Sequence, residues 1–213
     1  MVHFIFVRHG LSICNQERRF AGQLDAPLAD EGRRQAEAVS QYIHQNFAVD
    51  AICASDLSRT VDTVFPLSKT TGLPIQTYSD LRELYVGEWQ GMRIEDIKKE
   101  FPERFAEYLT CHELTHAEGR ETYVEMSVRA LRVMDEIAKE HDGKTVVIAT
   151  HHGVIRVLLA AWLGIPIKDF DDVPHLPNAS VTVVEYEDGK GKPICVGYRE
   201  YLEEIEKDTT MTV

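Results

Sequence analysis

Three short apolar runs, separated by segments with helical periodicity, constrain the fold of this chain more than any other feature of its sequence. The runs are VHFIFV at residues 2–7, VDAICAS at residues 49–55 and KTVVIAT at residues 144–150. Short runs rich in β-branched and aromatic residues are typical of buried strands. Because strands that alternate with helices usually form a parallel sheet with crossover helices, we expect an α/β fold.

Two of the intervening segments show the spacing of amphipathic helices. Residues 33–47 (RRQAEAVSQYIHQNF) and residues 121–141 (ETYVEMSVRALRVMDEIAKEH) carry apolar residues three or four positions apart. Positions at this spacing lie on one face of a helix. The residues that we expect to face the core are Ala36, Val39, Ile43 and Phe47 in the first helix and Val124, Val128, Leu131 and Ile137 in the second.

Two further segments predict helices that pack beside the sheet. Residues 55–72 predict a helix that has Asp56 or Ser58 as its N-cap and that ends near Gly72. Residues 154–164 (VIRVLLAAWLG) predict a buried helix that is too short to span a bilayer.

The remaining segments complete the expected architecture. Residues 73–84 predict a further strand and a loop, and residues 93–109 predict a polar helical cap interrupted by Pro102. Residues 179–201 predict two antiparallel strands joined by the turn DGKGKP. The complete prediction is a three-layer α/β sandwich, in which a mostly parallel central sheet carries one antiparallel edge strand, with a small helical cap.

Overall charge and cysteine spacing limit the partners and the location of the protein. The 213 residues, of which 44% are hydrophobic, are enough for one well-buried domain. A formal net charge of −12 argues against binding to nucleic acid or an anionic membrane through a broadly basic surface. The four cysteines show no metal-ligand spacing and no segment resembles a signal peptide, so we expect free thiols and a cytoplasmic location.

Basic side chains follow three of the predicted parallel strands at the point where each strand ends. Arg8 and His9 follow the first strand, Arg59 comes soon after the second, and His151 and His152 follow the third. The carboxyl ends of parallel strands share one edge of a sheet, where ligands of α/β proteins bind. In an acidic protein, this local gathering of Arg and His predicts a pocket for a phosphate group.

Five sequence motifs are similar to those of the histidine phosphatase superfamily, which includes the cofactor-dependent phosphoglycerate mutases and many small phosphatases. The motifs are VRHGLSICN, GQLDAPLADEGRRQA, ASDLSRTVDT, LRELYVGEWQG and VVIATHHGVIR, in the family's order between Val7 and Arg156. The resemblance implies a single histidine phosphatase domain over residues 1–213, with a helical cap inserted at about residues 92–119. We expect the chemistry of this chain to need neither a metal ion nor a cofactor.

The resemblance assigns catalytic roles to the gathered residues. His9 matches the family nucleophile, and a neutral imidazole can attack phosphorus to form a phosphohistidine. Arg8 and Arg59 match the arginines that clamp phosphate. His151 matches a second histidine that contacts the transferring phosphoryl group. Glu83 in LRELYVGEWQG matches the general acid and base.

Other positions match the family's binding pocket. Asn15 and Gln23 match polar pocket residues, and the backbone of Gly22 is expected to approach the ligand. His152 stands where many members have glycine, so either its backbone N–H donates to phosphate or its imidazole lines the pocket. Glu88 is the nearby alternative for the acid and base role, but we interpret it as a solvent-exposed turn residue.

The other histidines carry weaker signals. The adjacent imidazoles of His151 and His152 raise the alternative of a metal site, which the divergence of neighbouring helical side chains makes unfavourable. We interpret His112, His116 and His175 as surface residues of loops or of the cap.

Hydrolysis and mutase chemistry share the phosphohistidine step and differ in whether water or a second substrate takes the phosphoryl group. The mutases carry a longer insertion with additional arginines, whereas residues 91–119 of this chain contain only Arg93 and Arg104. We therefore expect a metal-independent phosphomonoesterase acting on a small phosphorylated metabolite. A phosphoglycerate mutase or sugar bisphosphatase is the alternative within the family, and a catalytically silent phospho-ligand-binding module is the alternative from another class. A homodimer that pairs the antiparallel edge of the sheet is a further expectation.

Overall fold

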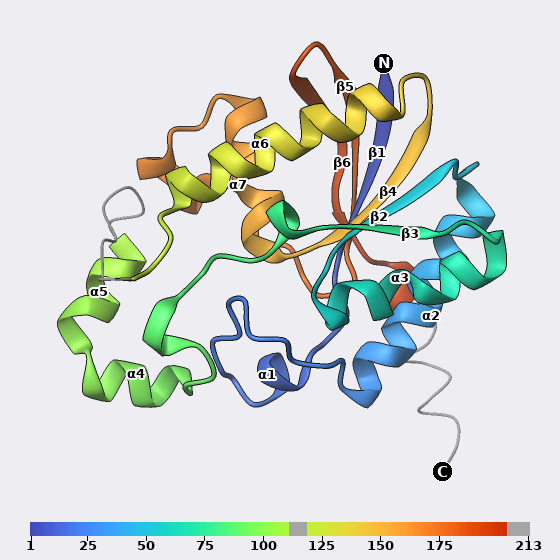
Figure 1. Cartoon of the computed structure of the whole chain (residues 1–213). Coiled ribbons are helices and arrows are strands. Elements are labelled where there is room, and N and C mark those ends of the chain that lie inside the picture. The colour runs from blue at the N-terminus through green and yellow to red at the C-terminus, as the bar shows by residue number, and fades with distance from the viewer. Residues whose placement is uncertain (111–118, 204–213) are drawn as a thin grey trace.

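The computed structural model of the chain describes residues 1–110 and 119–203, which form a six-stranded sheet with helices on both faces (Figure 1). The strands are β1 (Val2–Arg8), β2 (Ala51–Ser55), β3 (Ile75–Tyr78), β4 (Thr145–Thr150), β5 (Val181–Glu187) and β6 (Lys190–Tyr198). The α-helices are α1 (Ile13–Gln16), α2 (Asp30–Asn46), α3 (Ser58–Thr71), α4 (Ile94–Glu100), α5 (Pro102–Thr110), α6 (Tyr123–Glu140) and α7 (His152–Leu163). The 3-10 helices are η1 (Ser79–Leu81), η2 (Gly87–Trp89) and η3 (Ile167–Asp172). Cys111, His112 and His116 lie outside the described residues.

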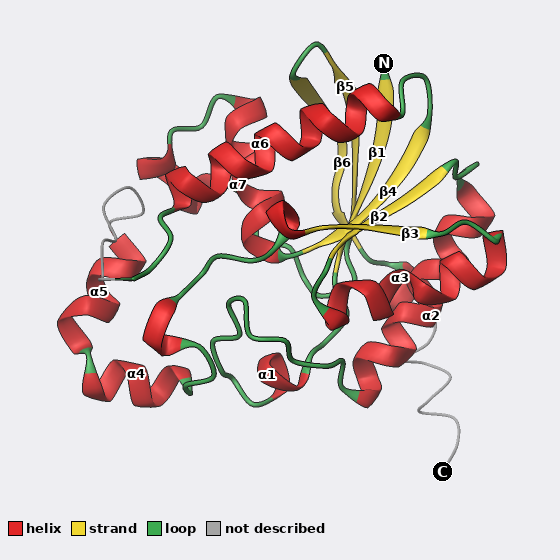
Figure 2. Cartoon of the chain, viewed as in Figure 1, coloured by secondary structure: helices red, strands yellow, loops and turns green. Residues whose placement is uncertain are grey.

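The sheet has the order β3-β2-β4-β1-β5-β6, and β1 to β4 run parallel to one another (Figure 2). β5 runs antiparallel to β1, and β6 pairs antiparallel with β5 at the outer edge. The predicted α/β class, with a mostly parallel sheet and antiparallel pairing at one edge, is therefore confirmed. Arg8 pairs with Thr150 and Ala54 with Ala149, so β1, β2 and β4 end at the same level of the sheet.

Different helices cover the two faces of the sheet (Figure 1). Ile5 and Val7 of β1 belong to the core under α2 and α3, whereas Phe4 and Phe6 belong to the core under α6 and α7. Successive side chains of a strand point to opposite faces, so a strand that is covered on both faces is apolar throughout. This double coverage explains the continuous apolar run at the start of the sequence.

Helix α6 presents a different face to the core from the one that its sequence predicts. Val124 and Val128 are exposed over 44% and 63% of their surface, and Ile137 is the one fully buried member of the predicted stripe. The buried residues of α6 are Tyr123, Met126, Ala130, Val133, Met134 and Ile137. This second stripe is longer and more continuous, so its burial removes more apolar surface from water. The predicted orientation of this helix was wrong.

Helix α3 begins without the side-chain cap that its sequence predicts. Its N-cap residue is Leu57 rather than Asp56 or Ser58. The backbone N–H of Ser58 instead donates to the Asp25 carboxylate at 2.8 Å, so a distant loop supplies the acceptor. The predicted end at Gly72 is confirmed by its left-handed backbone with φ of 74°.

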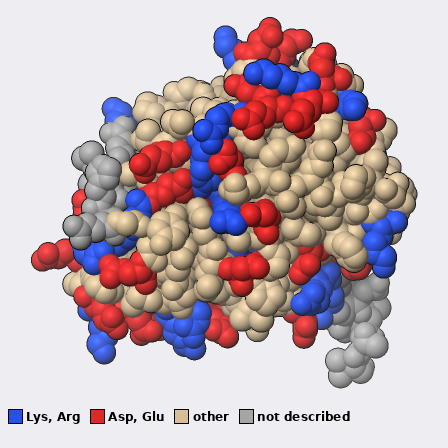
Figure 3. Space-filling view, in the orientation of Figure 1, with Lys and Arg blue, Asp and Glu red and all other residues tan. Residues whose placement is uncertain are grey.

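Helices α4 and α5 lie apart from the strands and are separated at the predicted proline (Figure 1). Phe105 and Tyr108 of α5 pack against Trp89, which is completely buried. These contacts join α5 to η2. On the face shown in Figure 3, acidic side chains lie among lysines and arginines. The division of the chain into one domain and an inserted cap stays a prediction.

Candidate active site

The ends of the central strands bring four of the predicted residues to one edge of the sheet. Arg8 ends β1 and His9 follows it, while His151 is the N-cap residue of α7, directly after β4. Arg59 lies in the first turn of α3, which follows β2. The rings of His9 and His151 meet edge to face, with 5.2 Å between their centroids.

The turn after β1 fixes the orientation of the His9 ring. Nδ1 of His9 lies 2.7 Å from the carbonyl oxygen of Gly10, a contact in which Nδ1 carries the proton and donates. The backbone N–H of His9 donates to Thr150, and that of Gly10 donates to the Thr63 hydroxyl at 2.9 Å. The lone pair of the neutral ring therefore lies on Nε2.

His9 and His151 are both buried imidazoles in their neutral form. His9 is 4% exposed and His151 is completely buried, with neither ring nitrogen of His151 hydrogen-bonded. Burial is the main cause that lowers the pKa of each ring well below its ordinary value, and the nearby charge of Arg59 lowers it further. A neutral His9 can act as a nucleophile, and an unpartnered His151 can form a hydrogen bond to a bound group.

Backbone carbonyl groups hold the two arginines in place. The guanidinium of Arg59 donates to Leu24 at 2.9 Å and to Gly22 at 2.8 Å, and that of Arg8 donates to Leu176. The Nε atom of each arginine has no hydrogen-bond partner. Burial lowers the pKa of Arg59 and lowers that of Arg8 to about 10, so both stay charged near neutral pH. Two anchored cations beside two neutral histidines suit an anionic ligand.

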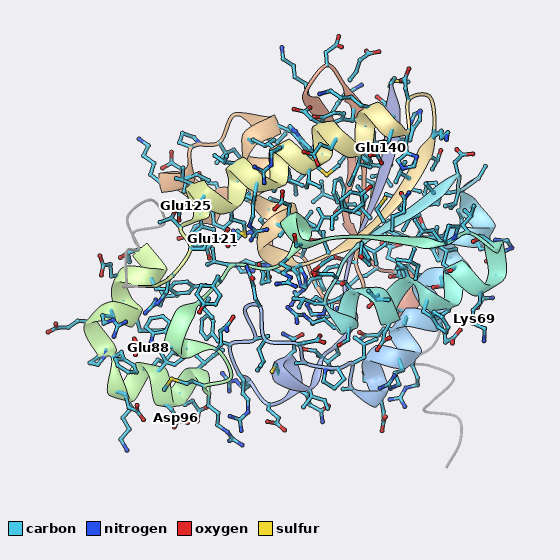
Figure 4. The ribbon with its side chains drawn as sticks, in the orientation of Figure 1. Lys69, Glu88, Asp96, Glu121, Glu125 and Glu140 are labelled. Carbon is cyan, nitrogen blue, oxygen red and sulfur yellow. The ribbon has the colours of Figure 1, made fainter. Side chains whose placement is uncertain are left out.

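The carboxylate of Glu83 is held at the start of α7. One oxygen accepts from the backbone N–H of Leu84 at 2.9 Å, and the other accepts from that of Gly153 at 3.2 Å. A Cβ at Gly153 would lie 2.3 Å from Oε1 of Glu83, so the approach requires glycine. Glu88, in contrast, is exposed and pairs with Arg104 at 2.5 Å, on the side of α4 and α5 (Figure 4). The expected exposure of Glu88 is confirmed, although the residue lies in the 3-10 helix η2 rather than in a turn.

These side chains surround a cavity of about 350 Å³. The predicted site residues that line it are Arg8, His9, Asn15, Gly22, Arg59, Glu83 and His152. An apolar and aromatic wall is formed by Phe20, Leu84, Val86, Ile94, Tyr108 and Tyr123. His151 and Gln23 are not among the lining residues. The cavity has the size of a small-molecule site, and its lining combines charged with apolar groups.

Gln23 has a different place from the one predicted for it. Its side-chain amide donates to the carbonyl oxygen of Glu83 at 3.2 Å, and its backbone N–H donates to Gln90 at 2.7 Å. It therefore supports the loop that carries Glu83. Gly22 does approach the cavity, and a Cβ there would lie 2.7 Å from Val86, in a backbone with φ of 52°.

His152 and His175 form a pair at the cavity. Nε2 of His152 lies 3.2 Å from Nδ1 of His175, and the two rings stack with 5.1 Å between centroids. Burial, followed by the charge of Arg8, lowers the pKa of His152 to about 3. His175 is exposed, as predicted, yet it also lines the cavity. Asn15 lies on the same cavity, and its Oδ1 accepts from the Ser12 hydroxyl at 2.9 Å.

Sequence reasoning missed several residues of this site. Arg19, Tyr108 and Tyr123 line the cavity, and the two tyrosine hydroxyl groups lie 3.2 Å apart. Nothing in the local sequence distinguishes these residues from ordinary helix and loop positions. Gly153 carried a usable signal, because it directly follows the two histidines at the predicted end of a strand.

Over residues 1–110 and 119–203, no group of three or more His, Cys, Asp or Glu side chains is arranged to hold a metal ion. Cys14, Cys53 and Cys195 are free thiols. None of the helices in the described part of the chain is long and apolar enough to cross a membrane.

Two characterised relatives resemble the chain over most of its length. It is 30% identical to a metal-independent phosphoserine phosphatase of Arabidopsis thaliana over 192 residues, which cover 89% of this chain and 79% of the relative. It is 32% identical to a glucosyl-3-phosphoglycerate phosphatase of Mycolicibacterium vanbaalenii over 184 residues, which cover 83% of this chain and 80% of the relative.

Solved structures share the fold. YhfR of Bacillus stearothermophilus matches with a TM-score of 0.90 and 27% identity, over 95% of this chain and all of that one. A mycobacterial glucosyl-3-phosphoglycerate phosphatase in complex with VO3 matches with a TM-score of 0.84 and 28% identity, over 92% of this chain and 99% of that one. The sequence model of the histidine phosphatase superfamily (branch 1) matches residues 4–197, and the chain therefore belongs to that superfamily.

Proposed function

We propose that this protein is a metal-independent phosphomonoesterase that hydrolyses a small phosphorylated metabolite through a phosphohistidine on His9. The observation that carries the proposal is the orientation of His9. Its Nδ1 is bound to the Gly10 carbonyl, and the ring lines a cavity that also contains Arg8, Arg59 and Glu83. A nucleophile, two cations for a phosphate and a carboxyl group for proton transfer thus share one cavity.

In the first half-reaction, the lone pair on Nε2 of His9 attacks phosphorus and the ester P–O bond breaks. The protonated carboxyl group of Glu83 gives its proton to the leaving oxygen, so an alcohol departs and the phosphoryl group stays on His9. The cations Arg8 and Arg59 stabilise the charge on the phosphoryl oxygens during this transfer.

In the second half-reaction, water attacks phosphorus and the N–P bond breaks. The Glu83 carboxylate takes a proton from the attacking water, inorganic phosphate leaves, and both His9 and Glu83 return to their starting states. His151 donates a hydrogen bond to a phosphoryl oxygen, a role supported by its unpartnered, buried ring. The backbone N–H groups at the start of α7 add positive potential beside the same oxygens.

The substrate that we propose is a phosphate ester of a small alcohol. The volume of about 350 Å³ suits a molecule of that size. The names of two relatives, a phosphoserine phosphatase and a glucosyl-3-phosphoglycerate phosphatase, give the first esters to test. Asn15, Gly22 and His152 are the lining residues that we propose for substrate binding.

We also propose that the chain is a single domain in which the segment with α4 and α5 is an inserted cap. Tyr108 of α5 lines the cavity, and Ile94 at the start of α4 lies on the same wall, which supports a role of the cap in substrate choice. A homodimer through β6 stays a prediction, and the exposed Ile194 and Val196 on this edge strand support it. Sedimentation of the purified protein tests that prediction.

The test of the proposed function measures phosphate release from p-nitrophenyl phosphate, phosphoserine, 3-phosphoglycerate and sugar phosphates. We expect the wild type to release phosphate equally with and without EDTA, and His9→Ala to release none. We also expect brief incubation with substrate to leave a phosphorylated wild-type protein whose phosphate is lost in acid. Phosphate release that survives His9→Ala would contradict the proposal. Faster transfer between phosphoglycerates than to water would indicate a mutase instead, and binding without turnover would indicate a phospho-ligand-binding module.

A further inference from the structure

Arg129 of α6 donates hydrogen bonds directly to the loop that carries Glu83. Its Nη1 donates to the carbonyl oxygens of Asp80 and Arg82, both at 2.6 Å, and its Nη2 donates to the carbonyl oxygen of Glu83 at 3.1 Å. Three backbone groups in and after η1 thus bind a single guanidinium. Arg129 of α6 therefore sets the path of the backbone at Glu83.

Glu121 completes the coordination of this guanidinium. Its carboxylate accepts from Nε of Arg129 at 2.5 Å and from Nη2 at 2.8 Å. The same carboxylate accepts from the backbone N–H of Tyr85 at 3.1 Å, on the other side of Glu83 in the sequence. Figure 4 shows Glu121 close to the first turn of α6. The Arg129–Glu121 pair therefore holds the chain both before and after Glu83.

All five N–H groups of Arg129 are used in these contacts, because an arginine has five donors and the structure gives each an acceptor. The pair is mostly buried, with 14% of the Arg129 side chain and 15% of the Glu121 side chain exposed. A buried donor that loses its acceptor costs more than a surface ion pair is worth. The loop therefore has one strongly favoured position.

We propose that the Arg129–Glu121 pair is a positioning device for proton transfer, which sets the distance between the Glu83 carboxyl group and the leaving oxygen of the substrate. The proposal rests on the proposed function, in which Glu83 is the general acid. Neither Arg129 nor Glu121 lines the cavity, and unlike the unpartnered ring of His151 both side chains are already bound to each other and to the loop, so neither residue touches the substrate. Both act through the backbone of Glu83.

This role has a kinetic signature that a general loss of structure lacks. A p-nitrophenolate ion leaves without a proton, whereas the alkoxide of an alkyl phosphate needs one. The parameter kcat/KM reports the steps up to departure of the alcohol. A misplaced Glu83 therefore lowers kcat/KM for alkyl phosphates much more than for p-nitrophenyl phosphate.

The experiment compares kcat/KM for p-nitrophenyl phosphate with that for an alkyl ester cleaved by the wild type, starting with phosphoserine. The variants are Arg129→Lys, which keeps the charge but has only three donors, and Glu121→Gln. We expect each to lose about 10- to 100-fold with the alkyl ester, the cost of a shift of about 1 Å in a reacting group. With p-nitrophenyl phosphate we expect a loss within about threefold, because that reaction does not need the proton.

A matched control lies one turn along the same helix. Arg132 pairs with the Asp80 side chain at 2.6 Å, but Arg132 is 61% exposed and binds no backbone group of the loop. Arg132→Lys is expected to leave both kcat/KM values unchanged. Glu83→Gln is the benchmark, with an expected loss of about 10²- to 10⁴-fold for the alkyl ester.

The outcomes distinguish failure of the positioning role of the Arg129–Glu121 pair from failure of the assignment of Glu83 as general acid. The positioning role is overturned if Arg129→Lys and Glu121→Gln lower kcat/KM equally for both esters. It is also overturned if neither variant lowers kcat/KM for the alkyl ester. If Glu83→Gln itself shows no preference between the esters, the assignment of Glu83 as general acid fails first. Thermal melting of each variant identifies unfolding, and Glu121→Gln provides the milder change if Arg129→Lys does not fold.

Discussion

Replacement of Gly153 by alanine is expected to lower the catalytic activity without lowering the stability of the fold. Gly153 is the second residue of α7, and its backbone N–H donates to Glu83 at 3.2 Å. The new Cβ would lie 2.3 Å from Oε1 of Glu83 and 3.2 Å from the terminal methyl of Met126. The tight contact involves the far end of a flexible side chain, so the carboxyl group moves while the helix stays in place.

The expected effects on stability and activity follow from that geometry. For the new Cβ and Oε1 of Glu83 to reach van der Waals distance, the carboxyl group must move away by about 1 Å. A shift of about 1 Å in a reacting group can lower the rate about 10²-fold. Alanine in place of glycine within a helix favours the folded state by roughly 0.5–1 kcal/mol. We therefore expect Gly153→Ala to lose about 100-fold in kcat/KM for an alkyl phosphate without a fall in its melting temperature.

The assay is steady-state phosphate release by wild type, Gly153→Ala, Glu83→Asp and the double variant, with thermal melting of each. The shorter Asp side chain relieves the contact with the new methyl group. Glu83→Asp should therefore cost less in the Gly153→Ala background than in the wild type, as a double-mutant cycle measures. Unchanged kcat/KM in Gly153→Ala, or strictly additive losses, would refute the reasoning that places the Glu83 carboxyl group against Gly153.

Three further outcomes are expected. Because the pKa values of buried His9 and His151 are lowered, the unfolded chain binds more protons below about pH 6.5, so the free energy of unfolding should be highest above that pH and fall as the pH drops. Urea titrations at several pH values measure this slope, and a flat profile would contradict it. Phe6→Ala should destabilise the fold by about 3–5 kcal/mol in the same assay, because the ring is completely buried under α7. Glu88→Gln should keep kcat/KM within about twofold of wild type, since Glu88 is exposed and its ion pair with Arg104 lies at the surface, and a large loss would reopen its competition with Glu83.

The sheet could be predicted from sequence because its signal is local. Residues 4–7, 51–54 and 146–149 are apolar over their whole length, and burial on both faces of a parallel sheet produces that pattern. The order of the strands was not predicted; in the structure β1 lies beside β4, which brings Arg8 and His151 to the same edge.

Local periodicity could not choose between two competing faces of one helix. In α6 the stripe with Val124 and Val128 and the stripe with Met126 and Val133 both have helical spacing. The choice depends on how much apolar surface α7 and the sheet can cover, which is a property of the assembled core. The cap of α3 failed for a similar reason, since its acceptor is Asp25 of a distant loop.

In the candidate site, too, residues that are held by local contacts could be predicted from the sequence, whereas the distant contacts that position Glu83 could not. His9 and Arg8 belong to one short motif, and the ring of His9 is oriented by the next residue in the chain, so sequence reasoning found them. Glu83 was found by its motif, but its position depends on Arg129, 46 residues away, and on Gly153, 70 residues away. No local pattern records such contacts.

The two arginines explain how one cavity can hold both a neutral nucleophile and a dianionic group. Burial alone keeps the pKa of His9 low, and the charges of Arg59 and Arg8 lower it further. The same charges attract the phosphate, and Glu83 in turn favours the protonated form of both arginines. If either arginine were neutral, His9 would gain protons more readily and the phosphate would lose a partner. The protonation state of the nucleophile and the affinity for the substrate are therefore set by the same two side chains, which explains why they are anchored to backbone carbonyl groups rather than paired with carboxylates.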